Sequence, residues 1–256
     1  MNEVLERRFA TMGARLSLPE RPWRGAPRID VRSDRRGEFF EITFGRGNLT
    51  EVEVVDVDSR GRHLLLLVRN GERKSKFLCG HDERHWFVAA VPESARGVTG
   101  VATAKAALQP IAVRELVARA RPKDPLRRRN AVFVRQGEWF FVPAAGLWVV
   151  DAFVLRNEPL MRGLGRAHVM QFAYRVGGQV VYVSGDRVIS EARFRALPEK
   201  QRRSGRWQRL VRDPLVFAKG TVRHPDHATV HLPDWHRVLM NTEQDAEAMR
   251  HVAFID

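Results

Sequence analysis

Apolar and polar residues alternate along much of this chain with the two-residue period of β-strands. After residue 27 the sequence reads R-I-D-V-R, F-F-E-I-T-F and E-V-E-V-V-D-V, and each run places its apolar side chains on one face of a strand. H-L-L-L-L-V and K-F-L-C then flank Asn70 and Gly71, a pair typical of a tight hairpin turn. Together with the following W-F-V-A-A-V, these runs predict an antiparallel meander in the N-terminal half.

A helical region follows the meander. Residues 98–108 are rich in alanine, and Pro110 suits the first turn of a second helix, in which apolar residues recur on one face. The stretch R-P-K-D-P-L-R-R-R at residues 121–129 ends that helix, because it contains two prolines and five basic residues. We interpret it as a linker or an exposed basic loop.

Strand patterns return in the second half of the chain. N-A-V-F-V-R and E-W-F-F-V-P surround a predicted turn at Gln136 and Gly137, and L-W-V-V-D-A-F-V-L predicts a further strand over residues 147–155. V-M-Q-F-A-Y-R-V and Q-V-V-Y-V-S are separated by Gly177 and Gly178, which predict a tight hairpin between them.

Helical patterns are fewer here. We predict short helices over residues 190–197 and 199–212, and a C-terminal one for which Thr242 is a candidate N-cap. The whole pattern predicts an α+β protein dominated by antiparallel sheet. Its two β-rich halves, residues 1–121 and 130–256, are also compatible with one continuous domain.

Positive charge dominates the composition. The chain has 44 basic and 30 acidic residues, a formal net charge of +14, and only six of the basic residues are lysines. A strongly basic protein attracts polyanions, and arginine pairs bidentately with phosphate. We therefore predict a nucleic-acid partner, with RNA and DNA equally compatible. A solvated arginine surface, or a structural or assembly subunit that binds an acidic partner protein, fits the same charges.

Two groups of arginines are the candidates for such a nucleic-acid surface. One group lies in the basic stretch after residue 121, and the other occupies one face of the helix predicted over residues 199–212. The candidate residues are Arg127, Arg128, Arg129, Arg202, Arg206 and Arg209.

The single cysteine, Cys79, excludes a disulfide within the chain and favours a reducing compartment. The N-terminus lacks the apolar core of a secretory signal, and the longest apolar run, residues 144–155, is short and interrupted by Asp151. We therefore expect a cytoplasmic protein without a membrane partner. The pattern carries no information on oligomeric state.

The most unusual segment is residues 222–241, V-R-H-P-D-H-A-T-V-H-L-P-D-W-H-R-V-L-M-N, which holds four of the nine histidines. It predicts a strand, a turn and a second strand that project histidines among arginines. Imidazole is a common metal ligand and a common general acid or base. The candidate metal ligands are His224, Asp226, His227 and His251, and the candidate catalytic residues are His227, His231, His236 and Asn241.

Asp226-His227, Asn241 and His251 follow one another in an order and at separations that resemble the HNH-type nuclease motif. That resemblance implies a metal-dependent nuclease or phosphodiesterase, in which a histidine activates water and other residues hold one divalent metal ion beside the phosphate. In that family the asparagine precedes the second strand of a ββα unit, whereas Asn241 follows a predicted strand. Contact with an anion, without catalysis, is the simpler interpretation of this segment.

A second polar cluster, C-G-H-D-E-R-H, runs from Cys79 to His85 at the tip of a predicted hairpin. It offers a mixed metal site or a thiol–imidazole pair for a hydrolase that acts on something other than nucleic acid. Alternatively, Cys79 is a small buried strand residue and the remainder is a polar loop. The chain contains no phosphate-binding or dinucleotide motif, so a divalent metal ion is the one cofactor that the sequence suggests.

Overall fold

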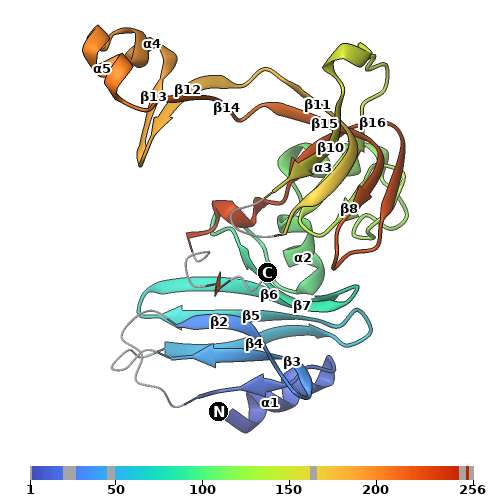
Figure 1. Cartoon of the computed structure of the whole chain (residues 1–256). Coiled ribbons are helices and arrows are strands. Elements are labelled where there is room, and N and C mark those ends of the chain that lie inside the picture. The colour runs from blue at the N-terminus through green and yellow to red at the C-terminus, as the bar shows by residue number, and fades with distance from the viewer. Residues whose placement is uncertain (1, 20–26, 45–49, 162–165, 248–251, 254–256) are drawn as a thin grey trace.

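The computed structural model describes residues 2–19, 27–44, 50–161, 166–247 and 252–253 of the 256-residue chain. Within them antiparallel sheets predominate and short helices fill the connections, which confirms the predicted α+β class (Figure 1). None of the helices in these residues is long and apolar enough to cross a membrane.

Two sheets and one helix build the N-terminal half. The elements are α1 (Asn2–Thr11), β1 (Leu16–Ser17), β2 (Arg28–Asp34), β3 (Gly37–Thr43), β4 (Thr50–Asp58), β5 (His63–Asn70), β6 (Arg73–Asp82) and β7 (His85–Val91). Strands β4 to β7 form an antiparallel meander as predicted, and Gly71, with φ of 60°, lies in the turn between β5 and β6. Strands β2 and β3 leave this meander and form a second sheet with β1 and β17 (Val252–Ala253).

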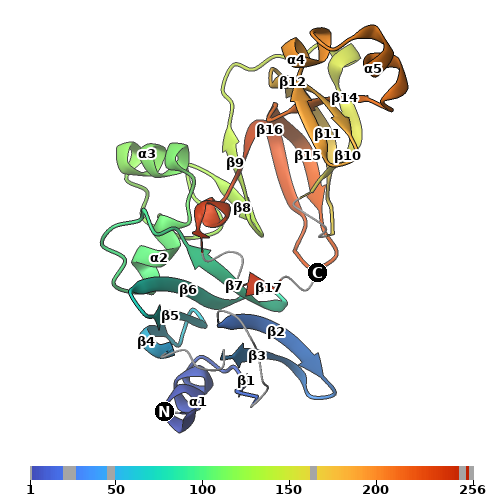
Figure 2. The same cartoon turned by 90° about the vertical axis from the view of Figure 1, so that its left-hand side faces the viewer.

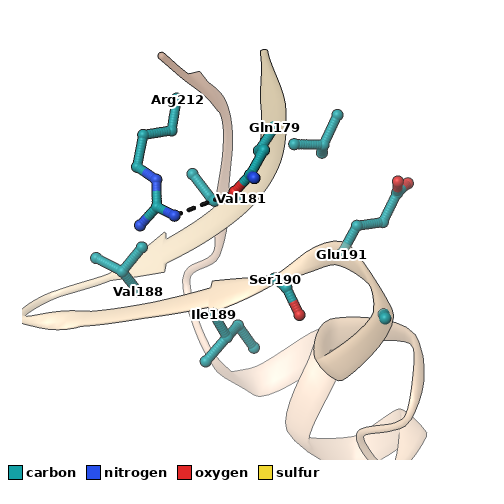
Figure 3. A pocket seen from close by; sticks show the side chains of 9 residues that line it. Gln179, Val181, Val188, Ile189, Ser190, Glu191 and Arg212 are labelled. Atoms are coloured by element: carbon teal, nitrogen blue, oxygen red, sulfur yellow. Dashed lines mark hydrogen bonds between the residues drawn. The ribbon is translucent and has the colours of Figure 1, made fainter.

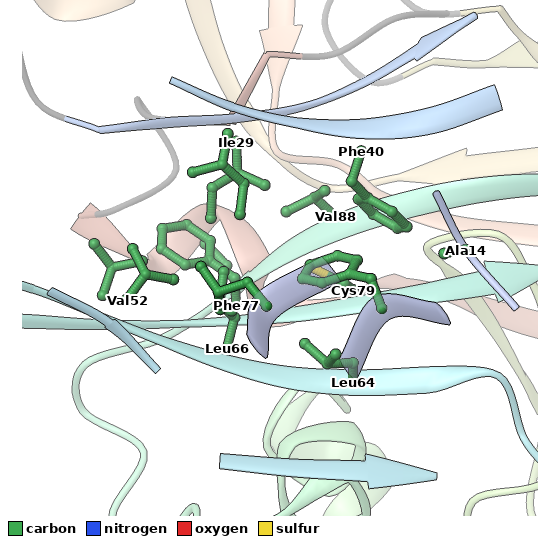
Figure 4. Close-up of a cluster of buried hydrophobic side chains, with 14 of the residues drawn as sticks. Ala14, Ile29, Phe40, Val52, Leu64, Leu66, Phe77, Cys79 and Val88 are labelled. Atoms are coloured by element: carbon green, nitrogen blue, oxygen red, sulfur yellow. The ribbon is translucent and has the colours of Figure 1, made fainter. Parts of the chain in front are cut away.

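The meander is buried on both faces, which explains the uninterrupted apolar run of β5. Leu64 and Leu66 belong to a core that the meander shares with the second sheet and α1, where Phe40 lies among them (Figure 4). Leu65 points to the opposite face and packs against α2 (Val101–Ala107). A fully buried leucine contributes about 1.5–3 kcal/mol to the free energy of unfolding. Because the leucines of β5 enter both cores, the meander packs on one face against the second sheet and α1 and on the other against α2.

The predicted helical region lies between the N-terminal sheets and the sheet of the second half (Figure 2). The first helix, α2, begins after Gly100, and its Val101 N–H donates to Asp56 Oδ2 at 2.8 Å. The second helix, α3 (Ile111–Ala120), begins after Pro110 as predicted and packs through Val113 on the sheet of the second half. The two helices thus cover different sheets.

A six-stranded antiparallel sheet forms the centre of the second half. Its elements, with the short helix η1 between them, are β8 (Val134–Gln136), β9 (Trp139–Pro143), η1 (Asp151–Phe153), β10 (Leu155–Leu160), β11 (His168–Val176), β15 (Leu215–Arg223) and β16 (Val230–Met240). The strand order is β10-β11-β15-β16-β9-β8. The sheet curls so strongly that Gln136, at the end of β8, hydrogen bonds to Val222 and Ala228 at the turn between β15 and β16.

Strands β11 and β15 continue into an arm that projects from this sheet (Figure 1). The arm consists of β12 (Gln179–Ser184), β13 (Arg187–Ser190), α4 (Glu191–Arg195), α5 (Glu199–Ser204) and β14 (Gln208–Arg212). The predicted hairpin at Gly177 and Gly178 is wrong, because β11 pairs with β10 and β15 whereas β12 pairs with β13 and β14. The two glycines carry the chain into the arm, and a Cβ at Gly178 would lie 2.7 Å from the Arg212 carbonyl oxygen.

Three other local predictions need correction. The helix predicted over residues 199–212 ends at Ser204, and Q-R-L-V-R at residues 208–212 pairs with β12 as strand β14. The strand predicted over residues 147–155 is an irregular segment followed by η1, with Trp148 80% exposed, so its apolar residues do not face a core. In the described residues up to 247, the start of the predicted C-terminal helix is a 3-10 turn, η2 (Thr242–Asp245), which Asn241 caps in place of Thr242.

Candidate metal centre

Three histidines from two separate parts of the chain meet at one end of the curled sheet. His168 begins β11, and His224 and His227 lie in the turn between β15 and β16. Because β11 and β15 are paired, with Val169 opposite Arg223, His168 is held beside that turn. The three possible ligand nitrogens lie within 4.8 Å of one another, and no other His, Cys, Asp or Glu group in the described residues converges in this way.

The imidazole ring of His168 stacks on those of His224 and His227, which are tilted by 31° relative to each other. The ring centroid of His168 lies 4.2 Å from that of His224 and 5.5 Å from that of His227, with interplanar angles of 25° and 19°. Zinc–nitrogen bonds of about 2.0–2.1 Å in a tetrahedron place ligand nitrogens roughly 3.4 Å apart. Binding of an ion would therefore require the rings to rotate and the nitrogens to approach by up to about 1.5 Å.

Gln136 determines which nitrogen of His168 is available. Its Nε2 donates to the carbonyl oxygens of Val222, at 3.2 Å, and Ala228, at 2.7 Å, so its Oε1 must face the ring. His168 Nδ1 lies 3.0 Å from that oxygen and therefore carries the proton. This leaves His168 Nε2 as the nitrogen whose lone pair is available, and such partners orient most metal-binding histidines.

His224 is held by the backbone on both sides. Its Nδ1 accepts from the Asp226 N–H at 3.1 Å, and its Nε2 donates to the Arg166 carbonyl oxygen at 3.3 Å. Burial, followed by the neighbouring His168, lowers the pKa of His224. The ring is thus favoured in its neutral form, and it must release one of these two hydrogen bonds to ligate a metal ion.

His227 has the strongest indication of a missing ligand. Its Nδ1 is buried and has no hydrogen-bond partner among the described residues, an arrangement that is costly in a protein interior. Burial is the main cause that lowers the pKa of His227 to about 4, although Asp82 opposes the shift. The imidazole is therefore neutral near pH 7, which is the form that binds metals.

Gly137, in the turn between β8 and β9, makes room for these rings. Its φ of 56° favours glycine, and a Cβ there would lie 2.8 Å from His227 Nε2 and 3.3 Å from His168 Cε1. Glu138 follows, with a carboxylate oxygen 3.6 Å from His168 Nε2. This turn therefore brings both space and a carboxylate to the cluster.

The tip of the β6–β7 hairpin contacts the histidine turn, so the two polar clusters singled out in the sequence lie side by side. Glu83 accepts a hydrogen bond from the Ala228 N–H, and Arg84 donates to the Pro225 carbonyl oxygen at 3.1 Å. His85 Nε2 lies 3.6 Å from Asp226. The cluster thus sits where the N-terminal hairpin meets the C-terminal sheet.

Cys79 takes no part in this contact. It is fully buried in the core of the N-terminal sheets, and burial raises the pKa of its thiol (Figure 4). His81, two residues away, packs edge-on against Trp86 with ring centroids 4.9 Å apart. A buried, protonated thiol is a poor nucleophile, so the position of Cys79 agrees with the interpretation of a small strand residue.

The other candidate residues of the histidine-dense segment lie outside the cluster. His231 is exposed on β16, and His236 is buried with its Nδ1 2.7 Å from the Asp234 carbonyl oxygen. Asn241 accepts a hydrogen bond from the backbone of Glu243 and donates to its side chain, so it caps η2. His251 lies outside the described residues. Of the four candidate ligands, the structure brings together His224 and His227, with Asp226 between them in the turn.

The arginine candidates are also dispersed. Arg128 pairs with Glu83 and lies 3.7 Å from Asp82, and Arg127 lies 3.7 Å from Asp124. The remaining candidates occupy an exposed loop position, α5, the link after it and β14, and these are, in that order, Arg129, Arg202, Arg206 and Arg209. The last three therefore belong to the arm and do not share one helix face.

Sequence reasoning missed His168, Gln136 and Glu138. His168 is a single histidine at the start of an ordinary strand pattern, Gln136 ends β8, and Glu138 lies in the turn that follows. Only the pairing of β11 with β15, and the curl that returns β8 to their turn, could have identified them.

Comparisons with known proteins give no match, whether with protein-family models, with curated proteins or with solved structures. The function is therefore argued from the residues of this chain.

Proposed function

We propose that this protein binds a divalent transition metal ion through His168, His224 and His227 and uses it to hydrolyse an anionic ester. The observation that carries the proposal is the convergence of these three imidazoles within 4.8 Å. Two further features support it, namely the orientation of His168 by Gln136 and the buried Nδ1 of His227 without a partner among the described residues. Three protein ligands with a further open position are typical of catalytic zinc sites.

The donor set indicates which metals fit. Imidazole nitrogens suit Zn²⁺, Cu²⁺, Ni²⁺ and Fe²⁺, whereas Mg²⁺ and Ca²⁺ prefer oxygen ligands. Burial favours the neutral form of His224 and His227, so their ligation displaces few protons near pH 7. We therefore expect zinc, or cobalt in its place, to bind more tightly than magnesium.

The surroundings suggest a hydrolytic role. A bound metal ion of this class polarises water or a phosphoryl oxygen. Glu138, 3.6 Å from His168 Nε2, is placed to accept a proton at the cluster. Arg166, with a side chain 57% exposed, pairs with Asp226 at 3.2 Å and would hold an anionic substrate by exchanging that carboxylate for the substrate. A phosphodiester is the substrate class that these groups fit best.

A structural role for the same metal ion is the second candidate. The cluster lies where the β6–β7 hairpin contacts the histidine turn through Glu83 and Arg84. An ion bound to His224 and His227 would hold that turn in place and stabilise the contact. Metal binding that raises the unfolding temperature without any hydrolysis would favour this role.

The test begins with protein stripped of metal by a chelator. We expect Zn²⁺ to bind with one-to-one stoichiometry by calorimetry, and Co²⁺ to give the visible absorption of a low-coordinate nitrogen site. His227→Ala should lose this binding, whereas His231→Ala, which alters an exposed histidine of the neighbouring strand, should retain it.

Hydrolysis is measured with bis-p-nitrophenyl phosphate, with and without added Zn²⁺. Metal-dependent turnover that is lost in His227→Ala supports the hydrolase. Stoichiometric binding without turnover on this ester or on a carboxylic ester contradicts hydrolysis and leaves the structural role. If wild-type protein binds no ion, or if His227→Ala binds as well as wild type, the metal centre itself is wrong.

A further inference from the structure

The arm formed by residues 179–212 differs from the rest of the molecule because it stands away from both cores. Its sheet, in the order β13-β12-β14, pairs with none of the other three sheets in the described part of the chain. In Figure 1 it extends from the ends of β11 and β15 and carries α4 and α5 at its tip. Such a projecting element needs its own internal packing to hold a shape.

Three aromatic rings supply that packing. Tyr182 on β12 stacks on Phe194 of α4 with ring centroids 3.7 Å apart and an interplanar angle of 4°. Phe194 also meets Trp207 edge-on at 5.8 Å, and Trp207 Nε1 donates to the Gln201 carbonyl oxygen at 3.2 Å. The rings therefore fasten both helices to the sheet, and their faces are used within the arm.

Charge on the arm is strongly unbalanced. Residues 186–212 contain nine basic and three acidic residues, and eight of the nine basic residues are arginines. Glu191 pairs with Arg195 at 2.8 Å, and Glu199 pairs with Arg203 at 2.6 Å. Two of the three carboxylates are thus already neutralised within their own helices.

Apart from Arg187, whose guanidinium lies over the Trp207 ring, five of the remaining cations are exposed and have no carboxylate within ion-pair distance in the described residues. They come from α4, α5, the link after α5 and β14, and they are Arg193, Lys200, Arg202, Arg206 and Arg209. We call them the arm cations. Exposed like charges without carboxylate partners repel one another, and binding of a polyanion relieves that repulsion.

A shallow hollow on the arm sheet is not part of this surface. It is lined by apolar side chains, among them Val181, Val188 and Ile189, and Arg212 at its edge donates to Gln179 Oε1 at 3.1 Å (Figure 3). Arg212 also lies 3.4 Å from Asp213. The hollow thus contains none of the arm cations.

We infer that the arm cations form a binding surface for the sugar–phosphate backbone of a nucleic acid. Arginine, which predominates here, pairs with phosphate in a fork geometry and is only weakly hydrated. Because Phe194 and Trp207 pack against each other within the arm, base stacking contributes little, and the surface recognises phosphates without regard to sequence. An acidic protein has neither regular phosphates nor this geometric match.

This surface is separate from the proposed metal centre. His168 of the metal centre begins β11, whereas the arm cations lie in the arm elements that follow β12, the continuation of β11. At about 3.3 Å per residue, the strands from His168 to Tyr182 are at most roughly 45 Å long. The inference therefore does not rest on the metal centre. Nucleic-acid binding is measured in the presence of a chelator, so that a failed test of the arm surface is distinguishable from a failed test of the metal centre.

Fluorescence anisotropy with a labelled random-sequence DNA duplex tests the inference, with salt varied between about 50 and 200 mM. The arm variant replaces three exposed arginines: Arg193→Gln, Arg202→Gln and Arg206→Gln. We expect its affinity to fall by at least about tenfold near 50 mM salt. The slope of log affinity against log salt should become shallower by about 0.9 for each phosphate that the variant no longer neutralises.

A matched control removes the same charge elsewhere. Arg8→Gln, Arg114→Gln and Arg119→Gln change three exposed arginines of α1 and α3 that pair with no carboxylate in the described residues. Equal losses of affinity in the arm variant and the control would overturn the inference, because overall charge would then explain binding. The inference is equally overturned if polyglutamate or phosphatidylserine vesicles displace the duplex at the same charge concentration. A far-ultraviolet spectrum and an unchanged unfolding temperature verify that the arm variant is folded.

Discussion

The histidine cluster and the arm differ in the state of their basic side chains, which are buried or half-buried imidazoles in the cluster and exposed, charged arginines on the arm. In the cluster, burial lowers the pKa of His224 and His227 and so favours their neutral form, while Gln136 orients His168 and the backbone orients His224. The arm exposes arginines whose charge is permanent, and Arg193, Arg202, Arg206 and Arg209 have no carboxylate partner in the described residues. Neutral, convergent nitrogens fit a metal ion, whereas dispersed permanent cations fit a polyanion.

This difference shows how little the net charge of +14 says about any one surface. Near the histidine cluster, Arg128, Arg135 and Arg166 are engaged with Asp82, Glu83 or Asp226, so much of their charge is neutralised locally. On the arm the excess stays exposed. A polyanion that responds to overall charge will therefore concentrate there, away from the histidines.

The largest expected effect separates the two regions directly. We expect His168→Ala to lower zinc affinity by more than the 10- to 100-fold that follows the loss of a residue merely orienting a ligand. Its duplex affinity in chelator should equal that of wild type, and the arm variant should show the reverse pattern. Calorimetry and anisotropy on the same preparations measure both. His236→Ala is the matched control, since it also removes a buried histidine. Loss of both zinc binding and duplex binding in one variant would show that the two regions do not act separately.

A smaller effect concerns the residue behind the cluster. Gln136→Leu removes the group that keeps the proton on His168 Nδ1, so zinc affinity should fall by about 10- to 100-fold. It also leaves the carbonyls of Val222 and Ala228 without this donor, at about 1–3 kcal/mol for each one buried without a partner. Denaturant unfolding in chelator isolates that second cost.

Gln109→Leu is the control for this substitution. Gln109 is likewise buried, and its Nε2 donates to the Pro125 carbonyl oxygen at 2.9 Å, away from the cluster. We expect a loss of stability without a change in zinc affinity. Equal effects of the two leucine variants on zinc would show that Gln136 acts only through stability.

Much of the fold could be predicted because local patterns in the meander agree with its tertiary structure. The alternating runs became strands, Gly71 lies in the turn between β5 and β6, and Pro110 precedes α3. Prediction failed where local patterns are compatible with two structures. Arg202, Arg206 and Arg209 recur at helical spacing, yet the chain leaves the helix at Gly205 and then pairs with β12. Strand pairing overrides spacing there.

The sequence predicted two of the three histidines of the candidate site. His224 and His227 stand out because they are close in sequence and share one turn. His168 is more than fifty residues away and carries no local signal, and its place is set by the pairing of β11 with β15. The contact of the β6–β7 hairpin with the same turn depends on the packing of separate sheets, which the pattern of residues in either half does not encode.

Acidification offers the smallest and most selective test, because histidines titrate between pH 4 and 7 and arginines do not. His63, buried beside Phe87, has its pKa lowered from 6.5 to about 4, mainly by burial and then by the nearby Lys105. In the unfolded chain this imidazole binds a proton at pH 5.5, whereas in the folded chain it stays neutral. Its contribution to stability is therefore complete above pH 6.5 and is lost as the pH falls toward 4.

At pH 5.5 this linkage amounts to about 1 kcal/mol relative to neutral pH. His63→Gln should therefore shrink the difference in the free energy of unfolding between pH 7.5 and pH 5.5 by about that amount. Any loss of stability that the substitution causes equally at both pH values cancels in this difference. His231→Gln, at an exposed site, should leave the difference unchanged. Duplex affinity should vary little over this range, since Arg193, Arg202 and Arg206 stay charged. A rise in duplex affinity on acidification, measured where the protein stays folded, would mean that protonated histidines, and not only the arm cations, hold the nucleic acid.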